Sequence, residues 1–329
     1  MRLSGEAMRP NRGGGHGKRL VTSAIVGAAL MGSVVLAGPT RPAGALATAA
    51  NDVPPSPTIL DNGSFALQGE TPFFDFVIIQ PPPYKSPYPL DGWVVGGAGV
   101  LISGEYVSPP PGANQSVVLE DITSGSVTQT VKTTPGWTYR LSWYGAGDPG
   151  PDTIPFRAMH VLWDNTVVAA PAFKVSDKFT SPIWELQHVT VTATAALSTV
   201  EFADATAAAD LGRGARSSMV AEVALAGVAD LYLPATAPAA GKLVAVVRTP
   251  AGQPLIDPRL SVRLYGTWKA VGSATATSQL ITTAAVVGGQ AVLQFHLPGS
   301  LAHQSVPAFA TVSGPGFLPA TAKLKIVVP

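Results

Sequence analysis

Glycine and proline interrupt this sequence so often that long helices are disfavoured along its length. The 329 residues include 34 glycines and 31 prolines, and both residue types weaken a helix interior. Between them lie short runs in which threonine and valine recur in alternation with other residues, a pattern typical of pleated strands. The sequence therefore predicts an all-β protein.

The first fifty residues differ from the rest and predict a secretory signal peptide over residues 1–50. A basic start that ends in Lys18-Arg19 is followed by an uncharged apolar run over residues 20–38 and by small residues around Ala45-Leu46-Ala47. This order is typical of a cleaved export signal, and a retained membrane anchor is the alternative. We expect a secreted or cell-surface protein with no stable membrane span after cleavage.

Charge and cysteine content exclude several classes of function. From Asn51 onward the chain has 15 basic and 19 acidic residues, so it lacks the basic excess that nucleic-acid binding requires. The sequence has no cysteine, which excludes thiolate catalysis and cysteine-ligated metal centres. We therefore expect no nucleic-acid partner and no cofactor.

The remaining sequence divides into two predicted domains. A short linker over residues 51–57 leads to the first domain, residues 58–227, in which many short strands alternate with Gly/Pro turns as in a jelly-roll sandwich. Residues 228–240 form an Ala/Pro linker. Residues 241–329 form a second, smaller domain whose strand spacing fits an immunoglobulin-like sandwich.

The clearest strand in the first domain is at residues 138–144, which place apolar side chains on one face. Residues 126–132 alternate in the same way, and Pro135-Gly136 between them predicts a turn. We therefore expect these two strands to form a hairpin.

Other segments are expected as a strand, a turn and a loop. Residues 59–67 are a further predicted strand. The run Gly96-Gly97-Ala98-Gly99 predicts a turn or bulge, because it lacks the pattern of a phosphate-binding loop. The Pro-rich residues 72–89 predict a surface loop and exclude a central strand.

Short motifs follow one another in order along the first domain. They are Asn62-Gly63-Ser64-Phe65, Gly92-Trp93-Val94-Val95, Val100-Leu101-Ile102, and the runs at 115–119, 125–130, 134–139 and 146–149. In this order they resemble the bacterial "choice-of-anchor C" surface proteins and a related plant cell-wall family of unknown function, over about half of the chain. The resemblance implies a galactose-binding-like jelly roll and a role at cell walls or in surface polysaccharide, without established catalysis.

Two departures from this family bear on calcium. The chain has Ala66 and Ala221 where the family often has Glu and Asp. In such jelly rolls these two acids commonly help to bind a structural calcium ion, whose ligands are carboxylate and carbonyl oxygens. We therefore expect no metal site, with Glu222 as an alternative ligand that keeps the question open.

Aromatic and polar side chains near turns are the candidates for ligand binding, because sugar C–H faces pack on aromatic rings. Trp137, beside the Pro-Gly turn, is expected to be exposed. Tyr106, Tyr84 and Tyr88 lie in predicted loops, and Arg140 lies on the strand face opposite the core residues. The alternatives for these residues are surface loops and a solvated strand charge.

Catalysis is not expected. No His-Glu-x-x-His or Gly-x-Ser-x-Gly motif occurs in the sequence, and a glycan hydrolase would need two acids across a cleft. The expected function is non-catalytic binding of cell-wall polysaccharide by a secreted or cell-surface protein. The alternative is a structural or protein-interaction component of the cell envelope with no sugar site, and a hydrolase is the least favoured.

Overall fold

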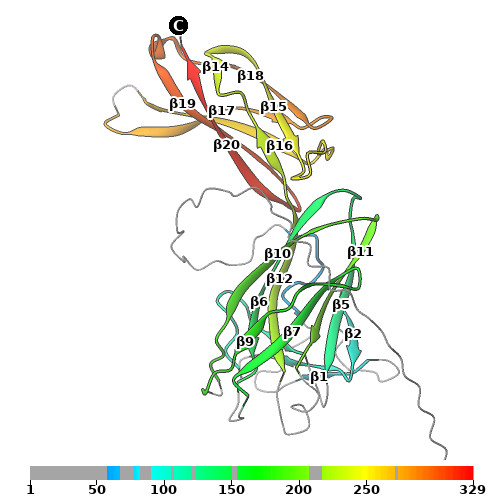
Figure 1. Cartoon of the computed structure of the whole chain (residues 1–329). Coiled ribbons are helices and arrows are strands. Elements are labelled where there is room, and N and C mark those ends of the chain that lie inside the picture. The colour runs from blue at the N-terminus through cyan, green and yellow to red at the C-terminus, as the bar shows by residue number, and fades with distance from the viewer. Residues whose placement is uncertain are drawn as a thin grey trace, which may run out of the picture. The chain divides into compact units, whose positions relative to one another are not determined.

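The computed structural model describes residues 58–66, 77–81, 90–104, 107–119, 124–149, 154–178, 180–206, 217–270 and 273–328. Within them the regular structure is almost entirely β-strand and surrounds two main hydrophobic cores (Figure 1). A jelly-roll sandwich is followed by an immunoglobulin-like sandwich, so the predicted fold class is confirmed. No helix in these residues is long and apolar enough to cross a bilayer.

Two sheets enclose the first core. One contains, in spatial order, β1 (Val77–Ile79), β3 (Val100–Ser103), β4 (Ser116–Val118), β12 (Ser218–Gly227), β6 (Thr138–Gly147) and β10 (Glu185–Thr192). The other contains β2 (Val94–Gly97), β5 (Gly125–Lys132), β11 (Leu197–Asp204), β7 (Phe156–Trp163) and β8 (Thr166–Ala169), and β9 (Ala172–Lys174) pairs with the start of β7.

Alternation along the strands decides which side chains enter this core. In β6 the side chains of Tyr139, Leu141 and Trp143 are buried in the core, as the sequence predicts. In β5 the buried positions include Val127 and Val131. Burying a large apolar side chain contributes about 1.5–3 kcal/mol, so these alternating residues hold the two sheets together.

The predicted hairpin between β5 and β6 is absent from the described strand pairings. β5 pairs with β2 and β11, whereas β6 pairs with β10 and β12. The Pro135-Gly136 turn forms as predicted, with Gly136 at φ +81° and the Trp137 amide donating to the Thr134 carbonyl over 3.0 Å. It carries the chain from one sheet to the opposite sheet. Both arrangements bury the same side chains, so alternation alone does not distinguish them.

Residues 59–66 form turns in place of the strand expected there. Asn62 and Phe65 have φ values of +47° and +58°, a left-handed conformation that ends an extended strand. Before these turns, the segment still follows β12, because the Ile59 amide donates to the Leu225 carbonyl over 2.8 Å. Only its first residues therefore lie alongside a strand.

The glycine run after Trp93 separates two strands that belong to different sheets. β2 ends at Gly97 and β3 begins at Val100. Gly97 and Gly99 have φ values of +65° and +118°, which residues with a side chain rarely adopt. The run is thus the turn that the sequence predicts.

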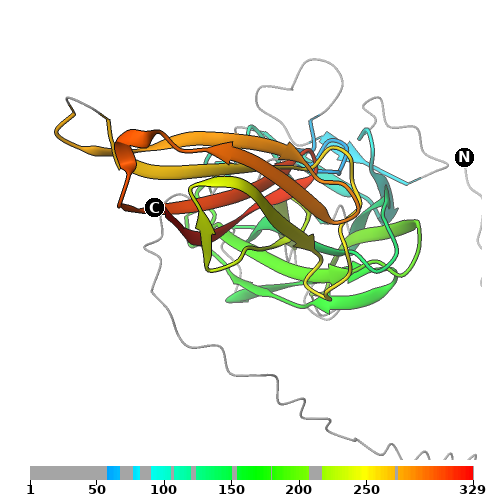
Figure 2. The same ribbon diagram turned by 90° about the horizontal axis from the view of Figure 1, so that it is seen from above.

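Two sheets enclose the second core, and one of them continues the first sheet of the first core. In this eleven-stranded sheet β12 pairs in parallel with β20 (Phe317–Val327) at Gly227 and Phe317, and the sheet continues with β19 (Ser305–Gly314), β16 (Ser261–Lys269) and β17 (Ala276–Ala285), while β14 (Thr236–Pro238) also pairs with β20. The other contains β13 (Asp230–Tyr232), β15 (Ala240–Arg248) and β18 (Gln290–His296), and a 3-10 helix η1 (Gly299–Leu301) precedes β19. Figure 2 shows the long strands of this core, gold to red, lying side by side.

Residues 228–240, expected as a linker, belong to the second core. They contain β13 and β14, and Ala229, Ala237 and Ala239 are buried there. The sequence indicated a linker because alanine and proline dominate residues 234–240. Small side chains nevertheless fill the space beside β20, with which β14 pairs in parallel.

Candidate functional site

A pocket opens at one end of the second core. It has a volume of ≈ 320 Å³ and opens between the end of β16 and the start of β19. Its lining is Thr267, Trp268, Lys269, Ser300, Leu301, Gln304, Ser305 and Val306. We call it the Trp268 pocket. Its volume is at the lower end of the range typical of small-molecule sites.

The indole of Trp268 forms one wall of the pocket. Gly266 and Trp268 share a face of β16, because strand residues two apart point the same way. A Cβ atom placed on Gly266 would lie 2.5 Å from Cζ3 of Trp268 and 3.0 Å from Cδ1 of Ile281. The absence of a side chain at Gly266 therefore lets the half-buried ring lie back over the strand.

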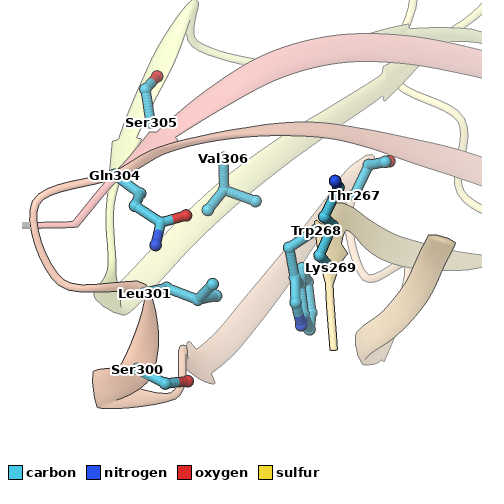
Figure 3. Close-up of a pocket in the computed structure, with 8 residues that line it drawn as sticks. All are labelled: Thr267, Trp268, Lys269, Ser300, Leu301, Gln304, Ser305 and Val306. Carbon is cyan, nitrogen blue, oxygen red and sulfur yellow. The ribbon is translucent and has the colours of Figure 1, made fainter. Parts of the chain in front are cut away.

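The opposite wall comes from η1 and the segment that leads into β19. Figure 3 shows Gln304 and Leu301 across the opening from the Trp268 ring, with Val306 between them. Leu301 and Val306 are buried members of the core, whereas Gln304 is exposed. An apolar floor and a free amide thus face one aromatic ring.

These groups have the chemistry for binding a neutral polyol. An aromatic face packs against C–H groups, and an amide both donates and accepts hydrogen bonds. The hydroxyl groups of Ser300 and Ser305 and the ammonium group of Lys269 add polar partners at the rim. No carboxylate or imidazole occurs among the eight lining residues, so the lining offers no side-chain pair for general acid–base hydrolysis.

A second pocket of ≈ 680 Å³ contains Trp137, which the sequence predicts as an exposed ligand-binding residue. Trp137 is half-buried, and its ring lies 5.4 Å from that of Phe317 at an interplanar angle of 58°. Phe317 also packs over Gly227, where an added Cβ would lie 2.6 Å from Cδ1 of the ring. Phe317 therefore covers part of the Trp137 ring.

An ion pair lines the same pocket. The Arg259 guanidinium donates to both carboxylate oxygens of Asp257, with the shortest contact at 2.7 Å. This hydrogen bonding lowers the pKa of Asp257 below its ordinary value. Tyr139 also lines the pocket; burial raises the pKa of its phenol, whose oxygen accepts a hydrogen bond from the Thr134 amide. The carboxylate is already bound by Arg259, so it is a poor candidate for a catalytic base.

Arg140 lies on the face of β6 that points away from the first core, as predicted. It is half-buried, and its Nε atom is buried without a hydrogen-bond partner. His188 belongs to the neighbouring strand β10, and its pKa is lowered first by burial and then by the charge of Arg140. The two described members of the predicted set therefore differ: Trp137 lines a pocket, and Arg140 lines neither of the two pockets.

The remaining predicted ligand-binding residues, Tyr84, Tyr88 and Tyr106, lie outside the described residues. Trp93, Trp143 and Trp163 are buried in the first core. The sequence-based set omitted Trp268. Its signal in the sequence is Gly266, two residues earlier, which leaves room for the indole.

In the region where the sequence predicts no calcium site, an asparagine side chain binds the backbone of two loops. The Asn62 amide nitrogen donates to the carbonyls of Ala66 and Asp91 over 2.9 and 3.1 Å, and its oxygen accepts from the Ala66 amide. Glu222 lies in a bulge of β12 at φ +47°, and burial raises its pKa. Among the described residues no group of three or more His, Asp or Glu side chains is arranged to hold a metal ion.

Comparisons with known proteins find similar solved structures only. No family model and no curated protein matches the chain. A family 35 carbohydrate binding module from Clostridium thermocellum matches at 12% identity and a TM-score of 0.30, over 46% of this chain and 97% of that chain. A CBM4 structure matches at 15% identity and a TM-score of 0.30, over 51% and 99% of the two chains.

One similar structure covers more of the chain. The adhesin domain of Epf from Streptococcus pyogenes matches at 8% identity and a TM-score of 0.31, over 72% of this chain and 80% of that chain. At such identities and scores a shared β-sandwich does not imply a shared ligand. The function of this chain must therefore be argued from its own side chains.

Proposed function

We propose that this chain is a non-catalytic carbohydrate-binding protein that acts outside the cell or at its surface. The observation that carries the proposal is the Trp268 pocket, in which one indole face lies opposite an uncharged amide and an apolar floor. Ring stacking supplies the affinity for a sugar face, and the amide and hydroxyl groups select among hydroxyl orientations. The lack of acids and imidazoles in the lining supports binding without hydrolysis.

The test is a binding screen of the protein against neutral and acidic cell-wall polysaccharides, with and without a chelator. We expect saturable binding to a neutral glycan that Trp268→Ala weakens by at least about tenfold, since an aromatic contact contributes about 0.5–1.5 kcal/mol beyond the area it buries. An affinity that is the same with and without the chelator would show that binding does not require a metal ion.

The matched comparison is Trp137→Ala, which removes a half-buried indole from the second pocket. If only that variant loses neutral-glycan binding, the glycan site is the Trp137 pocket and not the Trp268 pocket. Circular dichroism of each variant shows whether the sandwiches remain folded. A folded protein that binds no glycan contradicts the proposal.

A second candidate function is a structural or protein-interaction role, which one strand favours. β17 is ten residues long, pairs only with β16 among the described strands, and has no charged residue or proline in its sequence. Proteins commonly protect edge strands with charges, prolines or short length. A folded protein that binds no glycan but associates with itself as its concentration rises supports this function instead.

A further inference from the structure

Charge is unevenly distributed between the two sandwiches. Residues 58–227 carry 8 basic and 16 acidic side chains, a formal net charge of −8. Residues 228–329, which form the second sandwich, carry seven basic side chains and two carboxylates, Asp230 and Asp257, a formal net charge of +5. Arg259 binds Asp257, and Arg248 is in register with Asp230 on the neighbouring strand, so the other five cations have no acidic counterpart in this sandwich. The near-neutral total for the chain conceals this separation.

Several of these cations share one sheet face with a pair of aromatic rings. Arg263, Tyr265, Phe309, Lys323 and Lys325 lie on the outer face of the β16–β19–β20 sheet, since the residues that alternate with them are buried in the core. We call this surface the basic face. Lys323 is in register with Phe309, which is in register with Tyr265. The face therefore has a row of two rings and a cation.

The two rings and a neighbouring leucine form one apolar strip. Tyr265 and Phe309 stack with their centroids 5.0 Å apart and their planes at 13°, and both are half-buried. Leu280 of β17 continues the row beyond Tyr265 and is 55% exposed. Such a row presents a strip of apolar surface to a partner, in contrast to an isolated exposed ring.

The cations beside the rings are exposed. Three exposed strand residues carry these charges: Arg263, Lys323 and Lys325. The positions in register with them on neighbouring strands are Thr283, Thr311, Phe309, Pro307 and Thr236. None of these neighbours is acidic, and no ion pair to the three cations is found in the described residues. Their charge is therefore available to an anionic partner.

We infer that the basic face is a second binding site, for an acidic polysaccharide whose sugar rings carry carboxylate or phosphate groups. The occupant follows from charge complementarity and from the rings together. The C–H groups of the sugar rings pack along the apolar strip of Tyr265, Phe309 and Leu280, while the anionic groups pair with the cations Arg263, Lys323 and Lys325. A polymer can follow the row across successive strands, which lie about 4.8 Å apart. This site is distinct from the Trp268 pocket and does not require it.

The experiment is a titration of the full-length protein with polygalacturonate, which carries carboxylates, and with phosphomannan, which carries phosphates. We expect binding to at least one of them. Methyl-esterified polygalacturonate keeps the rings and removes the charge, so its binding should be at least about tenfold weaker. Raising salt from about 0.1 M to about 1 M shortens the screening length from about 10 Å to about 3 Å and should abolish binding.

The decisive variant is Lys323→Gln with Lys325→Gln, which removes two exposed cations from the basic face. We expect about a two- to thirtyfold loss of affinity, from about 0.2–1 kcal/mol for each exposed ion pair. The matched control is Lys242→Gln with Arg248→Gln, which removes the same charge from β15 in the other sheet. Equal loss in both variants would show a general effect of net charge and overturn the inference.

Four further measurements separate this inference from its competitors. Trp268→Ala should leave the acidic polysaccharide bound, so failure of the pocket and failure of the basic face are distinguishable. Tyr265→Ala should weaken polygalacturonate but not inorganic polyphosphate, which has no rings. If double-stranded DNA binds as tightly as the glycan, the face belongs to another partner and the inference is overturned. The same holds if the protein self-associates and Lys323→Gln with Lys325→Gln abolishes this association. Binding to neither polymer would also overturn the inference.

Discussion

Replacement of Gly266 by alanine tests how the Trp268 pocket is formed. The added methyl group would lie 2.5 Å from Cζ3 of Trp268, whereas ordinary van der Waals contact begins at 3.4 Å. The indole must therefore move by about 0.9 Å or more. Ile281 lies on the other side of the new methyl group, whose distance from its Cδ1 atom would be only 3.0 Å, so the methyl group cannot shift to relieve the contact with the ring. We expect the ring to swing into the pocket or out toward solvent.

Two magnitudes follow from this geometry. Overpacking typically costs about 1–3 kcal/mol, and the half-exposed ring can yield, so we expect a loss of about 1 kcal/mol in the free energy of unfolding. A displaced ring loses its stacking contact with a bound sugar, worth about 0.5–1.5 kcal/mol. Gly266→Ala should therefore weaken neutral-glycan binding about three- to tenfold, an effect similar to that of Trp268→Ala but smaller.

The assay combines urea unfolding with a glycan titration, and Gly299 provides the control. Gly299 lies in η1 next to the pocket residue Ser300, and a Cβ placed there meets no atom within 4 Å. Gly299→Ala should leave both measurements within about 0.5 kcal/mol of the parent. If Gly266→Ala is as stable and binds as tightly as the parent, the ring does not rest on Gly266 and the account of the pocket is wrong.

Two predictions concern the first sandwich. Burial raises the pKa of Asp204 despite hydrogen bonds from Thr206, so the protonated side chain stabilises the fold below the unfolded pKa near 4, and this contribution is lost as pH rises through the folded pKa. Asp204→Asn should therefore be more stable than the parent at pH 7. Urea unfolding should show this difference shrinking toward pH 4, and a pH-independent difference would refute the reasoning. Asn62→Ala removes the side-chain hydrogen bonds to Ala66 and Asp91 and leaves φ at +47°, so we expect the free energy of unfolding to fall by about 1–3 kcal/mol. Asn62→Gly relieves the φ strain and should be less destabilised in thermal melting. Equal destabilisation of the two variants would count against a strained backbone.

The residues that enter the cores were predictable, but the strand partners were not. Alternation in β5 and β6 identified Val127, Leu141 and Trp143 as buried, because the pleat alone determines which face a residue occupies. The same alternation is compatible with a hairpin and with two strands in opposite sheets. The turn at Pro135-Gly136 was predicted correctly in either case.

The candidate sites depend on contacts that no local pattern reveals. Trp137 lies at the predicted turn, yet Phe317, far away in sequence, covers part of its ring. Trp268 lines a pocket because residues beyond η1 return to face it. The basic face was accessible from sequence in part, since counting charges for each predicted domain separates the acidic segment from the basic one. The register that places Tyr265 beside Phe309 could not be predicted from the sequence.

The position of β12 has a consequence for the order in which the first sandwich folds. β12 contributes the last strand of this core in sequence, yet it lies in the middle of its sheet, between β4 and β6. Thr58, at the other end of the segment, bonds Leu225 across 167 positions. During synthesis the sheet therefore remains in two halves with unpaired edges until residue 227 has emerged. Such long-range closure makes folding slow and leaves the intermediate open to association.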